Sequence, residues 1–274
     1  MVQVWIYVVG ASNGPDHVSC VVPWRVDEDM IFFGPCKKRI RENLRGQFLG
    51  PSCNHNKATD ALFIVGVNAS NKEEIRKVVW AGRLSEVMTF AEAYRRFKED
   101  YRFKKLREHK CSPLHVCPVF KDGKLIGYEH MSNEHIKNEE WVSDFVSKWP
   151  NSNVLVEGRK LMLRQGTPWQ AFDRDCCMLL ENVFFASGQG IEFDKEALDI
   201  LREAQDKQDK KADIDAYAVF GRNVNGDVNG LRGNVRKLAG KLANRFIAWL
   251  EDRSHKVAKH QRSEGYGPAK SCCT

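Results

Sequence analysis

Hydrophobic residues occur along the chain in short runs that are rich in β-branched and aromatic side chains. Runs of this length and composition are typical of buried strands, and each is followed by residues that favour turns. The runs occupy residues 2–9, 18–24, 31–36, 61–67 and 78–84. A hairpin is predicted as well, because residues 116–120 and 125–128 flank an Asp-Gly pair at 122–123.

Apolar residues three or four positions apart predict helices between and after these strands. Ile40 and Leu44 share one face of a helix expected over residues 37–48. Thr89 and Glu92 match a capping box, in which the hydroxyl accepts from the third amide of a new helix and the carboxylate reaches back. A clear helix is therefore predicted to begin at Thr89.

The character of the chain changes near residue 160, beyond which helices dominate the pattern. Asp194 can cap a helix over residues 195–211, and residues 235–250 form an amphipathic pattern. We therefore predict an α+β domain over residues 1–158 and a helical extension over residues 159–274, with a flexible tail. These C-terminal helices are also the expected contact of any homo-oligomer.

Composition and charge narrow the class of protein. The 274 residues are 42% hydrophobic and 29% charged, which is ordinary for a globular protein, and the net charge of +7 suits an anionic partner. No apolar run approaches the roughly 20 residues that span a bilayer, so no membrane contact is expected. The nine cysteines include adjacent pairs at 176–177 and 272–273, which argues against a disulfide framework and favours a cytoplasmic location.

Standard catalytic and nucleotide-binding motifs are missing from the sequence. It contains no GxxxxGK[ST], no GxGxxG after a strand, no HExxH and no GxSxG. Cys53, His55, Cys111, His115 and Cys117 match no standard zinc spacing, so no metal or other cofactor is expected. These absences weaken an enzymatic interpretation without excluding it.

Basic and aromatic residues are the strongest functional signals. The cations at 37, 38, 39, 41 and 45, with Glu42 alone among them, could neutralise several phosphates or form a solvated helix face. Aromatic residues on the predicted strands could stack on a base or simply pack in the core. The residues predicted to contact nucleic acid are Trp24, Arg25, Phe33, Lys37, Lys38, Arg39, Arg41, Trp80 and Arg83.

The segment from Phe33 to Arg41 (FGPCKKRIR) resembles the Cys-Lys-x-x-Ile-Arg core of a nucleotide-modification-associated domain family, which we group with PUA-like folds such as ASCH and EVE domains. The resemblance covers about residues 1–150. Here Lys38 stands where the family often has proline, and the usual Gly-Asp after the arginine is not clear. The resemblance implies a curved mixed sheet or barrel with flanking helices, a pocket for a base or nucleotide, and a role with modified nucleic acids or in phage–host conflict.

Two functions follow as hypotheses. In the first, the protein binds a nucleotide or nucleic acid, DNA or RNA, with the cations on phosphate and the aromatic rings on a base. In the second, it is a hydrolase-type enzyme acting on a nucleotide or modified base. Its candidate catalytic groups lie near the basic segment, and they are Asp27 with Glu28, Cys36 and His55. Cys36 lies beside two lysines, which would favour its thiolate.

Overall fold

The fold is described here from a computed structural model of the chain. The structure describes residues 1–8, 24–27, 29–34, 38–50, 53, 55–58, 61–67, 77–104, 116–131, 137–185, 190–209, 220–222, 228–231 and 236–261. It is an α+β protein with mixed sheets. Its described strands form no closed barrel.

The chain forms two compact units that interleave along the sequence. Unit 1 comprises residues 1–22, 59–84 and 181–274, and unit 2 comprises residues 23–58 and 85–180. This division differs from the expected boundary at residue 158. The physical reason is strand pairing, because the first strand of the chain pairs with the strand just before the last helix, which joins the two chain ends in one unit.

The sheet of unit 1 has the strand order β15-β1-β5-β6. β1 (Gln3–Val8) runs parallel to β5 (Leu62–Val67) and antiparallel to β15 (Arg236–Ala239). β5 pairs antiparallel with the first part of β6 (Lys77–Met88), and the short β12 (Ile191–Glu192) pairs with the start of β6. The predicted strands at residues 2–9, 61–67 and 78–84 are thereby confirmed.

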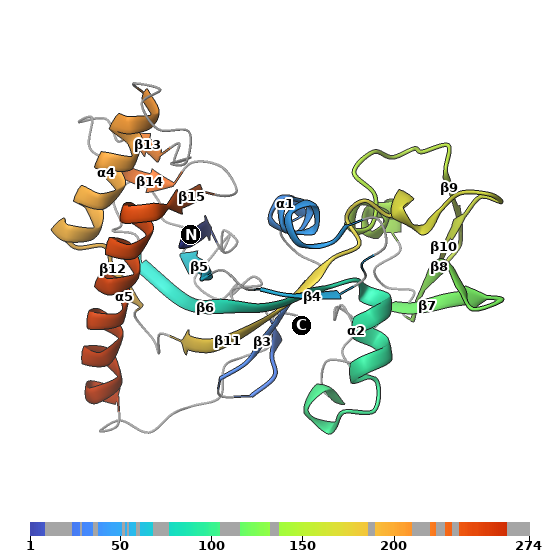
Figure 1. The fold of residues 1–274 in the computed structure, drawn as a ribbon, viewed down its shortest axis with the longest axis horizontal. Helices are drawn as coiled ribbons and strands as arrows, with labels where there is room; N and C mark the ends of the chain where they lie inside the picture. Colours follow the sequence, from blue (N-terminus) through green and yellow to red (C-terminus); the bar gives the residue numbers. More distant parts are fainter. Residues whose placement is uncertain are drawn as a thin grey trace. The chain divides into compact units, whose positions relative to one another are not determined.

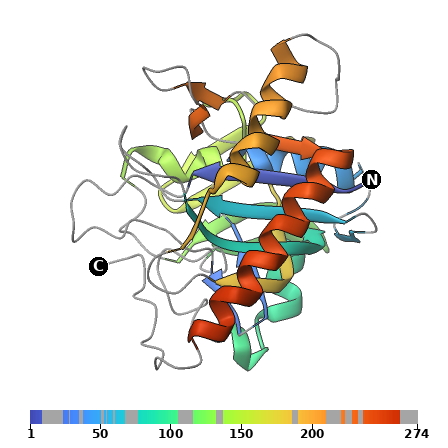
Figure 2. The same cartoon turned by 90° about the vertical axis from the view of Figure 1, so that its left-hand side faces the viewer.

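Two helices cover this sheet (Figure 1). α4 (Lys195–Asp209) and α5 (Gly240–Gln261) contact each other, and α5 crosses β1 and β15 (Figure 2). Their inward faces form an apolar core with the strands, in which Ile200 and Phe246 are fully buried. A separate antiparallel pair, β13 (Phe220–Arg222) and β14 (Val228–Leu231), also belongs to unit 1.

Unit 2 contains two sheets. The first has the order β6-β11-β3-β2 and includes the second part of β6, the first part of β11 (Cys177–Phe185), β3 (Ile31–Phe33) and β2 (Trp24–Arg25). β4 (His55–Lys57) pairs with the end of β6. The second has the order β7-β8-β10-β9, formed by β7 (Val116–Lys121), β8 (Lys124–His130), β10 (Lys160–Leu163) and β9 (Val154–Glu157). β7 and β8 are the hairpin predicted from Asp122-Gly123, whose residues both have positive φ.

The helices of unit 2 pack against these strands. They are α1 (Lys38–Phe48), α2 (Phe90–Phe97) and the 3-10 segments η1 (Tyr101–Phe103), η3 (Lys137–Asp144) and η4 (Trp169–Ala171). Thr89 caps α2 by accepting a hydrogen bond from the Glu92 amide at 3.2 Å, which confirms the predicted helix start. The core around α2 is rich in aromatic rings, including Phe90, Phe145 and Tyr128.

The region beyond residue 158 is less helical than the sequence pattern predicts. β10, β11, β12 and β15 all lie there, between and before the helices. The sequence of β11 (CMLLENVFF) begins as a continuous apolar run, and such runs do not distinguish a buried strand from a buried helix. Cys177 to Leu180 are buried, which accounts for the missing alternation.

Candidate functional site

Two of the aromatic residues predicted to stack on a base lie in the interior. Phe33 is 2% exposed and Trp80 is 0% exposed. Trp80 packs edge-on against Tyr7 at 5.7 Å, and its indole lies so close to Gly66 that a Cβ there would meet Nε1 at 2.2 Å. A ring without an open face cannot stack on a base, so the structure corrects this part of the hypothesis and gives both side chains a packing role.

Arg41 is also buried, with no exposed area. Its guanidinium donates to the backbone carbonyls of Asp144 at 3.1 Å, Arg174 at 2.7 Å and Cys176 at 3.0 Å. It also lies 3.5 Å from the Asp144 carboxylate and over the Phe90 ring at 5.5 Å. Arg41 therefore ties α1 to two distant segments of unit 2, and this arrangement corrects its predicted contact with phosphate.

Several predicted residues lie outside what the structure describes. Lys37, Cys36 and Glu28 are not described, and for Trp24, Arg25, Lys38 and Arg39 only the backbone is, in β2 and at the start of α1. Arg83 is described and exposed, on the part of β6 that belongs to unit 1.

Asp27, a predicted catalytic candidate, is half-buried in a turn between β2 and β3. It accepts a hydrogen bond from the Asp29 amide at 3.0 Å, and its carboxylate lies 3.8 Å from Arg102. These contacts hold the turn, as expected for an Asx-type arrangement. Among the described residues, the Asp27 carboxylate makes no contact with His55.

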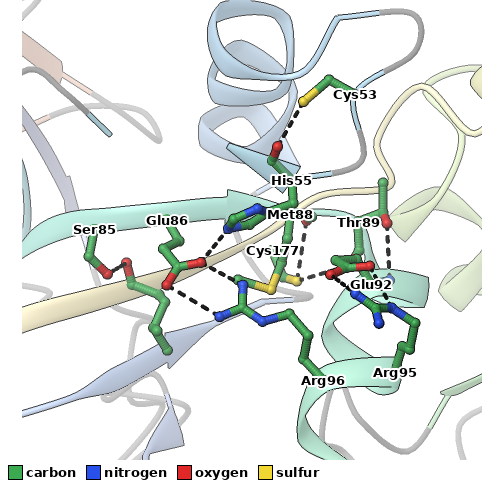
Figure 3. A network of polar contacts seen from close by, with 11 residues as sticks. Cys53, His55, Ser85, Glu86, Met88, Thr89, Glu92, Arg95, Arg96 and Cys177 are labelled. Carbon is green, nitrogen blue, oxygen red and sulfur yellow. Dashed lines mark hydrogen bonds and ion pairs between the residues drawn. The ribbon is translucent and has the colours of Figure 1, made fainter. Parts of the chain in front are cut away.

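His55, the third catalytic candidate, belongs to a polar network at the junction of β4, β6 and α2 (Figure 3). In the antiparallel β4–β6 pair, His55 is opposite Met88 and Lys57 is opposite Glu86. Diagonal residues two positions apart share a face of the sheet, which places Glu86 within reach of the imidazole. α2 begins just after β6, so Arg96 in its last turn reaches back to the same carboxylate.

Glu86 is the centre of this network. Its Oε2 contacts both Nε2 of His55 and Nη1 of Arg96, the latter at 2.5 Å, while Oε1 lies 3.4 Å from Nη2 of Arg96. The carboxylate is 13% exposed, whereas the side chains of His55 and Arg96 are each 29% exposed. The sheltered carboxylate of Glu86 is therefore held between two partly accessible side chains, the imidazole of His55 and the guanidinium of Arg96.

Electrostatics keep Glu86 ionised. Burial opposes its charge, but hydrogen bonds and the charges of Arg96 and His55 outweigh burial and lower the pKa of Glu86. The pKa of Arg96 is raised, mainly by its hydrogen bond to Glu86. At neutral pH, Glu86 is thus an acceptor for both neighbours.

Cys53 lies beside the network without joining it. Its thiol donates to the backbone carbonyl of His55 at 2.7 Å, and it is half-buried and not in a disulfide. Cys111 and His115 lie outside the described residues. Among the residues that are described, no three or more His, Cys, Asp or Glu side chains are grouped closely enough to hold a metal ion.

A second feature lies at the far end of the basic segment. Arg45, in the last turn of α1, donates from Nε to the Asp175 carbonyl at 3.2 Å, and its guanidinium lies 5.4 Å from the centre of the Trp169 ring. Its Nη2 is sheltered and has no hydrogen-bond partner within the described part of the chain. Trp169, in η4, is half-buried, so this site combines a cation with a partly accessible indole.

Asp175 is a fully buried carboxyl that joins these elements. It accepts from the Phe90 amide at the start of α2, at 2.7 Å, and from the Tyr128 hydroxyl. Burial raises the pKa of Asp175 to about 6, against the hydrogen bonds and nearby arginines that lower it. Burial and the Asp175 charge also raise the pKa of Tyr128. With no solvent access, this pair stabilises the start of α2 and has no route to a ligand.

Sequence reasoning found His55 but missed its partners. Glu86 and Arg96 belong to no motif, since the contact arises from strand register and from a helix that returns to its preceding strand. Trp169 carried one signal, its place next to Pro168 in a turn-rich stretch outside the predicted strands. Weighing tryptophans in turns above those in apolar runs would have found it.

Comparisons with family models, with curated proteins and with solved structures found no match to this chain. In the described ranges, none of the helices combines the length and apolar character that crossing a membrane requires.

Proposed function

We propose that the protein binds a nucleotide or a nucleic acid through unit 2. The observation that carries this proposal is the pairing of Arg45 with Trp169, at the end of the helix that contains the basic segment. Because Phe33 and Trp80 are buried, we assign the stacking of a base to the partly accessible indole of Trp169.

The chemistry of the pair fits a ligand with a phosphate and a base. A guanidinium that lies over an aromatic ring keeps its charge and its planar donors available to a phosphate. Stacking of a base on an aromatic side chain contributes about 1–3 kcal/mol.

The other cations of the basic segment extend the proposed binding site beyond Arg45 and Trp169. Lys37, Lys38 and Arg39 would contact the backbone of a longer ligand, where they would add salt-dependent affinity. The resemblance to nucleotide-modification-associated domains adds a modified base, a PUA-like pocket and a role in phage–host conflict, and the cysteine pattern adds a cytoplasmic location.

The test is binding of labelled single- and double-stranded oligonucleotides, followed by fluorescence anisotropy at several salt concentrations. We expect log affinity to fall linearly with log salt, and the Lys38→Ala/Arg39→Ala variant to flatten the slope by about one per lost phosphate contact. Trp169→Leu is expected to weaken binding about 5- to 150-fold with little change in slope, since stacking of a base is worth about 1–3 kcal/mol.

The matched control is Lys195→Ala/Lys241→Ala, which removes two exposed positive charges from the helices of unit 1. Its affinity should equal that of the unmodified protein. Binding that is insensitive to salt, or that falls equally in the control variant, would contradict the proposal.

A further inference from the structure

The network of His55, Glu86 and Arg96 has the arrangement of an acid–base centre. We propose that His55 is a catalytic general base that activates water for hydrolysis of a phosphoester or phosphoanhydride bond, with Glu86 and Arg96 as positioning residues. This inference rests on the proposed binding of a nucleotide or nucleic acid, which supplies the bond to be cleaved.

The position of the protons follows from the contacts. Because Glu86 is ionised, it can only accept hydrogen bonds, so the Nε2 of His55 that contacts it must carry the proton. In a neutral imidazole, the other nitrogen then holds the lone pair. Within the described part of the chain, the only ring contact of His55 is this one through Nε2, so Nδ1 is left to accept a proton from water.

Arg96 fixes the geometry of the carboxylate. It contacts both oxygens of Glu86, at 2.5 Å and 3.4 Å, which restricts rotation of the carboxyl group. An imidazole that is held by an oriented carboxylate keeps one tautomer and one ring orientation, as in hydrolytic triads. The ionised Glu86 also stabilises the imidazolium that forms when His55 takes a proton.

The solvent exposure of Glu86 and His55 differs in the way that an acid–base centre requires. The carboxylate is 13% exposed and so is protected from competing water, while the imidazole is 29% exposed and can meet a substrate. Around them, Lys57 and Arg95 are exposed on β4 and α2, and Arg95 is paired with Glu92. Three cations (Lys57, Arg95 and Arg96) and two carboxylates (Glu86 and Glu92) then surround His55. When the imidazole is neutral, their net charge is +1, which favours an anionic substrate.

The step balances without a further reactant. Nδ1 of His55 takes one proton from water as the water oxygen forms a bond to phosphorus. The bond from phosphorus to the leaving oxygen breaks, and that oxygen receives the proton back from Nδ1 of the imidazolium. A positioned general base of this kind contributes about 10²- to 10⁴-fold to a rate.

A purely structural network would use the same contacts to hold α2 against β4 and β6. The following experiment separates this structural role from the catalytic one. The full-length protein is incubated with a nucleoside triphosphate, a dinucleotide and a single-stranded oligonucleotide, and products are separated by chromatography. We expect turnover of at least one probe, a loss of about 100-fold or more in His55→Ala, and partial recovery on adding free imidazole. A structural staple would not be restored by imidazole.

Two further variants complete the test. Glu86→Gln keeps the shape of the side chain but removes its charge, and we expect it to lower turnover at least 10-fold while the protein remains folded by circular dichroism. Lys121→Ala removes an exposed cation from β7, outside the network, and should keep the activity. His55→Gln, which retains a polar side chain, guards against a folding defect in the alanine variant.

The outcomes also separate catalysis from binding. Probes that bind with salt-dependent affinity but are not turned over overturn the catalytic role of His55 and leave the proposed binding intact. Turnover that survives in His55→Ala overturns it as well. If none of the probes binds, the proposed function itself fails.

Discussion

The two units differ most in what they bury. The described core of unit 1 is apolar, formed by the strands of its sheet and the inward faces of α4 and α5. Unit 2 holds all of the buried polar and charged side chains that the structure describes, which are Arg41, Thr89, Glu92, His130 and Asp175. An apolar core is stabilised mainly by burial, whereas buried polar groups repay their desolvation only with full hydrogen bonding.

This difference indicates where function is expected. Arg41 and Asp175 hold α1, α2 and the segment before β11 in one arrangement. Arg45 lies on α1 and contacts this segment, and Arg96 of the His55 network lies on α2. A rigid polar framework beneath partly accessible groups is what positions a binding site. Unit 1 shows a well-packed sheet and helices without such a framework in its described residues.

Removing the Arg41 guanidinium should have the largest effect. Arg41→Met keeps the length of the side chain but leaves three sheltered carbonyls without their donor, and we expect it to destabilise unit 2 by about 3–5 kcal/mol. Chemical denaturation with hydrogen exchange read peptide by peptide measures this loss. Arg83→Met, the same change at an exposed position of unit 1, should stay within about 0.5 kcal/mol. Equal losses would erase the contrast between the units.

The pH dependence of unit 2 should reflect Asp175. Folding raises its pKa from 3.8 to about 6, so the folded state holds a proton that the unfolded state has lost between these values. Stability from this group is therefore present below pH 4 and falls as pH rises to about 6, by about 3 kcal/mol at most. Asp175→Asn should remove this slope from thermal unfolding curves, while Asp199→Asn on α4 should not. A slope that persists in Asp175→Asn would contradict this account.

A smaller effect is expected in unit 1 at Asp194. Its carboxylate caps α4 through the Ala197 amide at 3.1 Å and also accepts from Trp249 and Arg253 of α5, both at 2.9 Å. Asp194→Ala should destabilise unit 1 by about 1–2 kcal/mol, the usual range for a lost cap. Denaturation of this variant alongside Asp199→Ala checks the value. A loss that appears instead in the peptides of unit 2 would show that the units do not unfold separately.

The smallest effect should come from the exposed ion pair between Arg245 and Glu203, on α5 and α4. Arg245→Ala is expected to change stability by less than about 1 kcal/mol, because solvent screens exposed pairs. Denaturation at low and high salt measures this change, and added salt should reduce it further. A loss as large as that of Asp194→Ala would mean that exposed charges, and not only the apolar core, hold unit 1 together.

Local structure was largely predictable from the sequence. The strands β1, β5 and β6, the β7–β8 hairpin and the cap at Thr89 follow from patterns that span only a few residues. The pairing of β1 with β15 did not follow, because it joins residues more than 200 positions apart and no local pattern encodes it.

Whether a predicted site residue can reach a ligand depends on its burial, which the sequence does not show. Arg41 looks like its basic neighbours in sequence, but it is one helical turn from Leu44 and shares that inward face. Trp80 is an ordinary core residue in a part of β6 where residues 80–82 are all buried. His55 could be proposed from its residue type alone, whereas Glu86 and Arg96 depend on tertiary contacts that a single sequence does not reveal.

Hydrogen exchange of the full-length protein, with and without a saturating oligonucleotide, tests most directly whether unit 2 contains the binding surface. We predict slower exchange in peptides from α1 and η4, around Arg45 and Trp169, and unchanged exchange in α4 and α5. Protection confined to the helices of unit 1, or no protection while the oligonucleotide is bound, would contradict the account.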